Sequence, residues 1–202
     1  MKRQPSVRGA LLVFLGYLTV IVIVNRIAAA DFDFGDVAAS ADNTRDGVVI
    51  PVLASSIYLT VVTSLLGWWR PALFEPKQRP KVPTWMRAIP VLGVLVSVIN
   101  IVRSEHRGDF TTTHWMWIII GFLLVGYSEE LMTRGLLVTG FRSAMPEIRV
   151  MYISALLFGV MHGLNIFFGQ AVGTTIVQVI GTIPMGILFY LLRRVSGGLI
   201  LP

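Results

Sequence analysis

Long apolar runs separated by short polar stretches dominate the chain. A membrane-spanning helix needs about 20 consecutive apolar residues. Six runs reach or approach that length, at 9–30, 48–69, 86–102, 114–140, 150–168 and 171–192. The pattern predicts an all-α, polytopic transmembrane bundle of about six spans, with residues 1–202 forming a single membrane domain. The third run is short and contains Pro90, so its span is expected to tilt, to thin the bilayer locally or to cross incompletely.

Composition strengthens the membrane assignment. Of the 202 residues, 54% are hydrophobic and 14% are charged, whereas soluble domains are about 45–50% apolar and about 25% charged. The absence of cysteine excludes a disulfide framework, a thiolate nucleophile and a cysteine-based metal site. The net charge of +6 comes from basic clusters between the apolar runs, as in membrane-protein loops, so no nucleic-acid partner is expected.

The loops alternate in charge. Basic residues gather before the first run and after the second, fourth and sixth runs: Lys2, Arg3, Arg8, Arg70, Lys77, Arg79, Lys81, Arg87, Arg142, Arg149, Arg193 and Arg194. The loop at 31–47 is acidic, and the loop at 103–114 has mixed charge. The positive-inside rule therefore places the N-terminus in the cytoplasm, and we expect an integral protein of a prokaryotic plasma membrane.

The ends of the runs carry two further signals. Tryptophans that are expected to anchor at the membrane interface are Trp68, Trp69, Trp85, Trp115 and Trp117. The segment 70–83 is Pro-rich and basic, so it is expected to be an exposed cytoplasmic connection.

The first run allows a second interpretation. Its basic start, the apolar stretch 10–24 and the three alanines before Asp31 resemble a signal peptide with an A-x-A cleavage site. We favour an uncleaved first span, because the run is long for a signal peptide and because its removal would disturb the alternation of loop charges.

The fourth run contains three charged side chains within the stretch "GYSEELMTRGLL" (126–137). Glu129, Glu130 and Arg134 would each cost about 2.5–3.5 kcal/mol at the bilayer centre, so they must be compensated. On an α-helix Glu130 and Arg134 can pair along one face, while Glu129 is rotated by about 100° from Glu130. The spacing predicts one glutamate anchored by Arg134 and the other free for a second task.

His162, in the fifth run, is expected to meet Glu129. At about 1.5 Å of rise per residue, the two residues lie about 16 and 18 Å from the cytoplasmic ends of consecutive antiparallel helices. A carboxylate and an imidazole that face each other can activate water. Asn165 lies three residues after His162 and shares its face. Other interpretations remain open. His162 could be an interhelical hydrogen-bonding group, and the acid–Arg pair could stabilise helix packing or form part of a transport pathway.

The remaining polar residues give weaker indications of function. His106 and His114 lie at or beyond a span end and are assigned no role, while Thr174, Thr175 and Gln178 fit helix packing better than a cavity lining. The sequence contains no Gly-rich phosphate loop and no H-E-x-x-H zinc signature. No cofactor is therefore expected. We favour a site without a metal ion, because only one imidazole accompanies the two glutamates, while a divalent metal ion stays an open alternative.

Two motifs carry a resemblance to a known family. EELMTR (129–134) matches the pattern EExxxR, and FGVMH (158–162) matches FxxxH, in the right order. Over residues 114–202 the sequence thus resembles the CAAX protease and bacteriocin-processing (CPBP, or Abi) family of intramembrane proteases. The resemblance implies peptide-bond hydrolysis in the membrane, with a peptide or protein substrate, prenylated or not, and lipid as partners. It implies that Glu129 is the general base, that His162 assists it, and that Glu130 and Arg134 orient and hold the site.

The family pattern continues beyond a segment like "RRVSGGLILP" into a helix with HxxxN or HxxxD, whereas the sequence ends at Pro202. Either further chain, a partner or a second copy supplies these groups, or the protein is catalytically impaired. Asn165 is expected to substitute only in part for the oxyanion donors of that helix, each typically worth about 2.7–4 kcal/mol. The main alternative function is a catalytically impaired membrane scaffold or bacteriocin-immunity protein with the same fold. An ion or proton transporter that uses the intramembrane acids is a third hypothesis.

Overall fold

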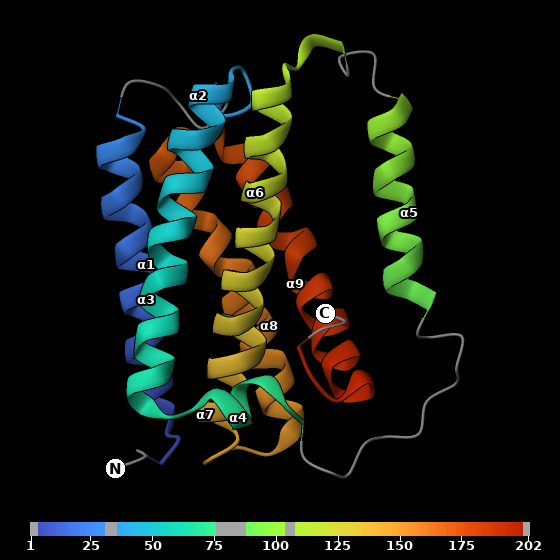
Figure 1. Ribbon diagram of the computed structural model, residues 1–202. Helices are drawn as coiled ribbons and strands as arrows, with labels where there is room; N and C mark the ends of the chain where they lie inside the picture. Colours follow the sequence, from blue (N-terminus) through green and yellow to red (C-terminus); the bar gives the residue numbers. More distant parts are fainter. Residues whose placement is uncertain (1–3, 31–35, 76–87, 104–107, 200–202) are drawn as a thin grey trace.

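Figure 1 shows the computed structural model of the protein as a bundle of helices. The structure describes residues 4–30, 36–75, 88–103 and 108–199. Within these ranges, five helical segments are long and apolar enough to cross a membrane: Val7–Ala28, Ala41–Leu66, Thr112–Phe141, Glu147–Phe168 and Val172–Ser196. No strand occurs in the same ranges, so the predicted all-α polytopic fold is confirmed.

Three of the five segments change helix type along their length. The second consists of α2 (Ala41–Thr44), the π-helical η2 (Arg45–Val49) and α3 (Ile50–Leu66). The third consists of α6 (Thr112–Glu129), the π-helical η5 (Glu130–Leu137) and α7 (Val138–Phe141). The fourth begins as α8 (Glu147–Met161) and continues as the 3₁₀-helix η6 (His162–Phe168). The other elements are α1 (Val7–Ala28), α4 (Trp69–Leu73), α5 (Ala88–Arg103) and α9 (Val172–Ser196).

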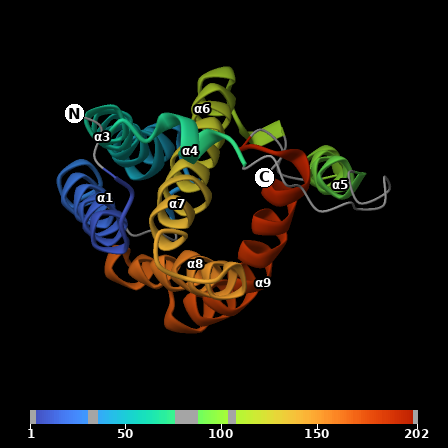
Figure 2. The same cartoon turned by 90° about the horizontal axis from the view of Figure 1, so that it is seen from below.

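The third predicted span corresponds to α5, a helix of 16 residues. At about 1.5 Å per residue it extends about 24 Å, less than the roughly 30 Å of a bilayer core. α3 ends beside α4 at one end of the bundle, whereas α6 begins beside α2 at the opposite end (Figure 1). The chain between α3 and α6 therefore has to pass along the bundle, and α5 runs in that direction on the side of α6 and α9 (Figures 1 and 2). The structure thus has a short helix where the sequence predicted a short span.

The core lies towards the end of the bundle that carries the N-terminus. There η5 packs against α1, α4 and α8, and the side chains of Leu136, Leu137 and Val138 are fully buried. Trp68 is also buried, and its ring lies against Gly9 of α1. The prediction of an interfacial anchor is therefore wrong for Trp68, because this ring fills the core.

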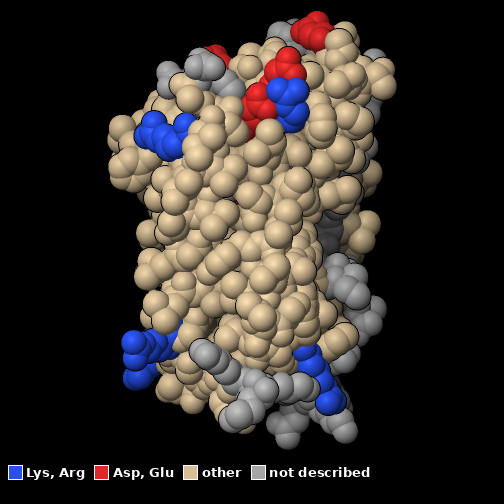
Figure 3. All heavy atoms as spheres, turned by 60° about the vertical axis from the view of Figure 1, so that its left-hand side comes forward, with Lys and Arg blue, Asp and Glu red and all other residues tan. Residues whose placement is uncertain are grey.

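The outer surface between the two ends is apolar. Figure 3 shows a broad belt without charged side chains, with Lys, Arg, Asp and Glu confined to the two ends of the face in view. Large apolar side chains such as Leu12, Leu65 and Phe122 are exposed. A surface of this kind is stable against lipid and unfavourable in water.

Glycines allow α8 and α9 to pack closely. A side chain at Gly159 would overlap Ile183, and a Cβ at Gly186 would lie 2.9 Å from Cα of Ala155. Small residues at such positions are typical of closely packed membrane helices. Gly169 has φ 94°, and this left-handed conformation turns the chain from η6 into α9.

The segment 70–83 differs from the exposed connection that the sequence predicted. Arg70 and Pro71 are exposed, but Glu75 is buried. The N–H of Glu75 donates to the carbonyl of Gly197 at 3.1 Å, which joins this segment to the end of α9. Residues 76–83 lie outside the described residues, as do Trp85, His106 and the basic residues at 2, 3, 77, 79, 81 and 87.

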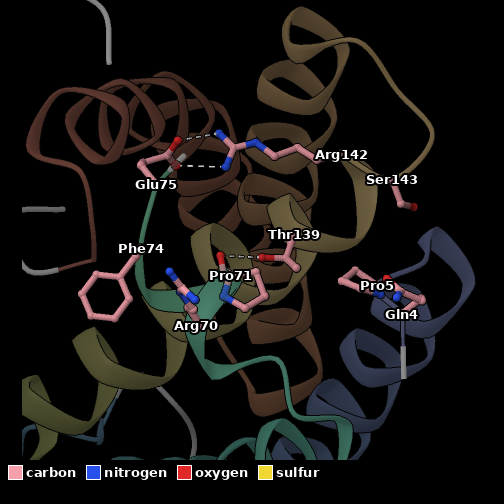
Figure 4. Close-up of a pocket in the computed structure, with 9 residues that line it drawn as sticks. All are labelled: Gln4, Pro5, Arg70, Pro71, Phe74, Glu75, Thr139, Arg142 and Ser143. Atoms are coloured by element: carbon pink, nitrogen blue, oxygen red, sulfur yellow. Dashed lines mark hydrogen bonds and ion pairs between the residues drawn. The ribbon is translucent and has the colours of Figure 1, made fainter. Parts of the chain in front are cut away.

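Three arginines converge on the buried carboxylate of Glu75. The distances from their guanidinium nitrogens to its oxygens are 3.0 Å for Arg142, 2.7 Å for Arg193 and 3.1 Å for Arg194. Figure 4 shows the two-pronged contact from Arg142 beside a cavity of about 810 Å³. Burial alone would lower the pKa of Arg142, but its hydrogen bonds to Glu147 and Glu75 raise that pKa above its usual value. The sequence suggested Arg142, Arg193 and Arg194 only as loop charges. In the structure they also hold the ends of α7 and α9 to the segment that follows α4.

Candidate active site

The charged motif lies where an α-helix becomes a π-helix. Glu129 is the last residue of α6, and η5 begins at Glu130 and contains Arg134. The α-helical geometry expected for the motif is therefore wrong from Glu130 onward, and the backbone there forms the wider hydrogen-bonded turn of a π-helix. Such turns are frequent at functional sites, because they redirect side chains without ending the helix.

Only 2% of the Arg134 side chain is exposed, and one of its terminal nitrogens, Nη2, has no hydrogen-bond partner among the described residues. Arg134 forms the predicted ion pair with Glu130, at 3.0 Å, and it donates a hydrogen bond of 2.6 Å to Oγ1 of Thr133. The central carbon of its guanidinium, Cζ, lies 3.9 Å from the ring centre of Phe158 on α8 and 4.9 Å from that of Phe189 on α9. Arg134 thus connects η5 to both of the following helices by charge and by cation–π contact.

His162 has a defined tautomer because of its position at the end of α8. Its Nδ1 lies 2.8 Å from the carbonyl oxygen of Phe158. A carbonyl can only accept, so Nδ1 carries the hydrogen, and Nε2 of the neutral ring is left with a free lone pair. The edge-to-face contact with the Phe158 ring, at 5.1 Å between centres, fixes the imidazole further.

Glu129 and His162 face each other as the sequence predicted. Nε2 of His162 lies 3.8 Å from Oε1 of Glu129. This separation is too long for a direct hydrogen bond. A water molecule can bind to both atoms from the side, donating one hydrogen to the carboxylate and the other to Nε2. Such a water would point its oxygen lone pairs away from both groups.

A cavity of about 440 Å³ adjoins this pair. Its polar lining residues come from four parts of the chain: Tyr17 and Asn25 from α1, Ser128 and Glu129 from α6, His162 and Asn165 from η6, and Gln178 from α9. The hydroxyls of Tyr17 and Ser128 are 3.4 Å apart. The sequence interpretation missed Tyr17 and Asn25, because single polar residues in an apolar first span give no sign of the cavity they line.

The two glutamates lie beside different spaces. Glu129 lines the cavity with His162, whereas Glu130 lines a separate apolar recess beside Leu73 and Leu199. This division matches the expectation of one glutamate held by Arg134 and one left for another task. Within the described ranges, no group of three or more His, Cys, Asp and Glu side chains could hold a metal ion.

His114, to which the sequence gave no role, is buried far along α6 from Glu129. Its Nε2 lies 3.0 Å from the hydroxyl of Thr44. The contact joins α6 to α2, so His114 has a structural explanation outside the site.

Residues 111–202 match a family model described as type II CAAX prenyl endopeptidase Rce1-like. The match includes both motifs and every residue of the Glu129–His162 and Glu130–Arg134 pairs. This part of the chain is therefore similar to the CPBP/CAAX protease family. No curated protein and no solved structure matches the chain.

The family and the fold agree on a membrane location. Five long apolar helices, together with the similarity of residues 111–202 to a family of membrane proteases, indicate an integral membrane protein. Its α6–α9 region contains both family motifs, while α1 and η2 complete the wall of the cavity beside them.

Proposed function

We propose that the protein is an intramembrane endopeptidase that hydrolyses a peptide bond in a membrane-associated protein or peptide. The observation that supports this function best is the facing pair of Glu129 and His162, 3.8 Å apart beside a cavity of about 440 Å³. A water molecule between them would be polarised by two acceptors while its oxygen stays free to attack. General-base catalysis of this kind typically accelerates a reaction by about 10²–10⁴-fold.

In the proposed reaction, the oxygen of this water bonds to the scissile carbonyl carbon while one of its protons passes to Glu129. The tetrahedral intermediate then collapses, and its carbon–nitrogen bond breaks. The leaving nitrogen takes up that proton from Glu129, so the products are one carboxylic acid and one amine. The hydrogen bond from Nδ1 to Phe158 keeps Nε2 directed at the reacting groups throughout.

Glu130 and Arg134 serve as positioning residues in this proposal. Arg134 contacts Phe158, and the ring of Phe158 contacts His162. A shift of Arg134 would therefore move Glu130 and, through the ring of Phe158, the imidazole of His162. Small displacements of this kind are costly, because the attacking water and the carbonyl carbon must approach to about 3–3.5 Å.

The family name suggests a substrate class. Type II CAAX prenyl endopeptidases give the family model its description, so we propose a peptide with a prenylated cysteine near its C-terminus as the first substrate to test. The exposed apolar belt of the bundle supports a substrate that reaches the site from the lipid phase.

The test is cleavage of an internally quenched peptide with a farnesylated cysteine followed by three residues, by purified protein in micelles. We expect the Glu129→Gln variant to lose at least about 10²-fold in kcat, because it keeps the shape of the side chain and loses the base. Asp42→Asn is the matched control, since Asp42 is an exposed carboxylate of α2 paired with Arg45, and it should cleave like the wild type.

Cleavage that is equally fast in E129Q and D42N would contradict the catalytic role of Glu129. Binding of the peptide without cleavage by the wild type would instead favour the scaffold alternative.

A further inference from the structure

Two primary amides meet in the cavity beside the proposed catalytic pair. Nδ2 of Asn165, in η6, donates to Oε1 of Gln178, in α9, at 3.0 Å. Both residues are half-buried, and both line the cavity that Glu129 and His162 line. The sequence had suggested helix packing for Gln178 and partial oxyanion stabilisation for Asn165, without connecting the two.

The local structure holds this pair next to His162. Side chains three residues apart eclipse one another on a 3₁₀-helix, so Asn165 stands over His162 on the same face of η6. Gln178 precedes Val179 and Ile183, which close on Gly159 of α8. The close approach of α8 and α9 therefore fixes the helix that carries Gln178.

The pair has unused hydrogen-bonding capacity. Two primary amides offer two carbonyl oxygens and two NH₂ groups, and their mutual bond uses one oxygen and one hydrogen. Among the described residues, no further partner is recorded for the NH₂ of Gln178 or for Oδ1 of Asn165. If both amides were turned over, Asn165 and Gln178 would only exchange roles. In either orientation one NH₂ donor and one carbonyl acceptor remain for a ligand.

This donor and acceptor match the acceptor and donor of a peptide group. We propose that the Asn165–Gln178 pair binds the main chain of the substrate, and that the NH₂ of Gln178 donates to the carbonyl oxygen of the scissile bond. The inference rests on the proposed endopeptidase function and extends it with a residue outside both family motifs.

The chemical benefit follows from the charge that develops on this oxygen. When water adds to the carbonyl carbon, the oxygen becomes an oxyanion, and a fixed N–H donor stabilises it more than it stabilises the ground state. Gln178 transfers no proton in this step, so the proton balance stays with the water, Glu129 and the leaving nitrogen.

The test compares kcat and KM of the Gln178→Leu variant with the wild type, using the farnesylated quenched peptide in micelles. Leucine fills a similar volume without a donor, so we expect kcat to fall by about 10²–10³-fold, with a much smaller change in KM. Thr174→Val is the matched control, because Thr174 is an exposed polar residue of the same helix. It should leave both constants unchanged.

A swap variant separates chemistry from packing. Asn165→Gln combined with Gln178→Asn keeps two primary amides and the total side-chain length, so we expect it to recover most of the activity that Q178L loses. Thermal unfolding midpoints in the same micelles should differ little among Q178L, T174V and the wild type. If kcat falls in Q178L only to the extent that its unfolding midpoint also falls, the loss comes from packing and the proposal is overturned.

Two further outcomes distinguish this inference from the proposed function. If E129Q is inactive and Q178L cleaves like T174V, the role of Gln178 is wrong while the endopeptidase function stands. If the wild type does not cleave, binding of the same peptide to wild type and Q178L decides: weaker binding to Q178L supports main-chain recognition by the pair. Equal binding to the two proteins, or no binding to either, overturns main-chain recognition by the pair together with the proposed hydrolysis.

Discussion

Arg134 shows how one residue can join three helical elements. Its side chain combines an ion pair with Glu130, a hydrogen bond to Thr133 and cation–π contacts with Phe158 and Phe189. Lysine could supply the charge but not the broad, delocalised cation that contacts both rings. The requirement at this position is therefore for a guanidinium rather than for a positive charge alone.

Replacing Arg134 by Leu should destabilise the protein strongly. The change leaves Glu130 largely buried without its partner, and breaking a buried ion pair in this way costs about 3–5 kcal/mol. We expect the free energy of unfolding, measured by SDS titration in mixed micelles, to fall by about that amount in R134L and by less in R134K. The double variant E130L/R134L should lose less than the sum of its single changes, because neither charge remains.

Arg149→Leu provides the comparison for R134L, since Arg149 is exposed at the start of α8. A stability of R134L equal to that of R149L would show that the buried pair contributes little.

The sequence predicted residue pairs better than residue environments. The Glu130–Arg134 pair and the meeting of Glu129 with His162 followed from spacing and from the rise of a helix, and the distances of 3.0 Å and 3.8 Å confirm both contacts. Phe189 and Tyr17 gave no comparable signal. Each lies in an apolar run, and its contact with the site depends on how whole helices pack, which local sequence does not encode.

At the scale of elements, helix positions were predictable and helix types were not. Apolar runs located five long segments and the short α5. The π-helix η5 and the 3₁₀-helix η6 occupy residues whose side chains would also suit an α-helix. The local sequence therefore gave no sign of the change in helix type. The buried role of Glu75 was missed because its three arginine partners lie far from it along the chain, Arg142 directly after α7 and Arg193 and Arg194 near the end of α9.

Glu75→Gln tests whether this cluster fastens the ends of the helices. Arg193 is fully buried, so the loss of the carboxylate leaves its charge without compensation, at a cost of about 3–5 kcal/mol. We expect faster hydrogen exchange in E75Q at residues 193–199, where the strand-like contact between Phe74 and Gly198 would open.

Glu147→Gln is the contrasting change, because Glu147 is partly exposed while contacting Arg142 and Arg194. Exposed or half-exposed pairs usually contribute about 0–1 kcal/mol, so E147Q should exchange nearly like the wild type. Equal protection of residues 193–199 in E75Q and the wild type would argue against the fastening role.

At the scale of the whole molecule, the distribution of charge suggests an orientation that remains a prediction. The end with the N-terminus and α4 carries the arginine cluster around Glu75, with Arg142, Arg193 and Arg194. The opposite end carries the acidic side chains of α2 and η2, Asp42 and Asp46. By the positive-inside rule, the first of these ends faces the cytoplasm. In either orientation, the chain from the end of α3 to the start of α6 has to pass from one side of the membrane to the other, because these two points lie at opposite ends of the bundle.

The absence of cysteine makes this orientation testable by labelling. Ala144→Cys marks the exposed loop at the N-terminal end, and Ala39→Cys marks an exposed position at the opposite end. A membrane-impermeant maleimide added to intact cells should label A39C and spare A144C, and permeabilised cells should label both. The cysteine-free parent controls for background labelling. Labelling of A144C but not of A39C in intact cells would reverse the orientation, and it would mean that the basic end is held outside the cytoplasm against the usual bias.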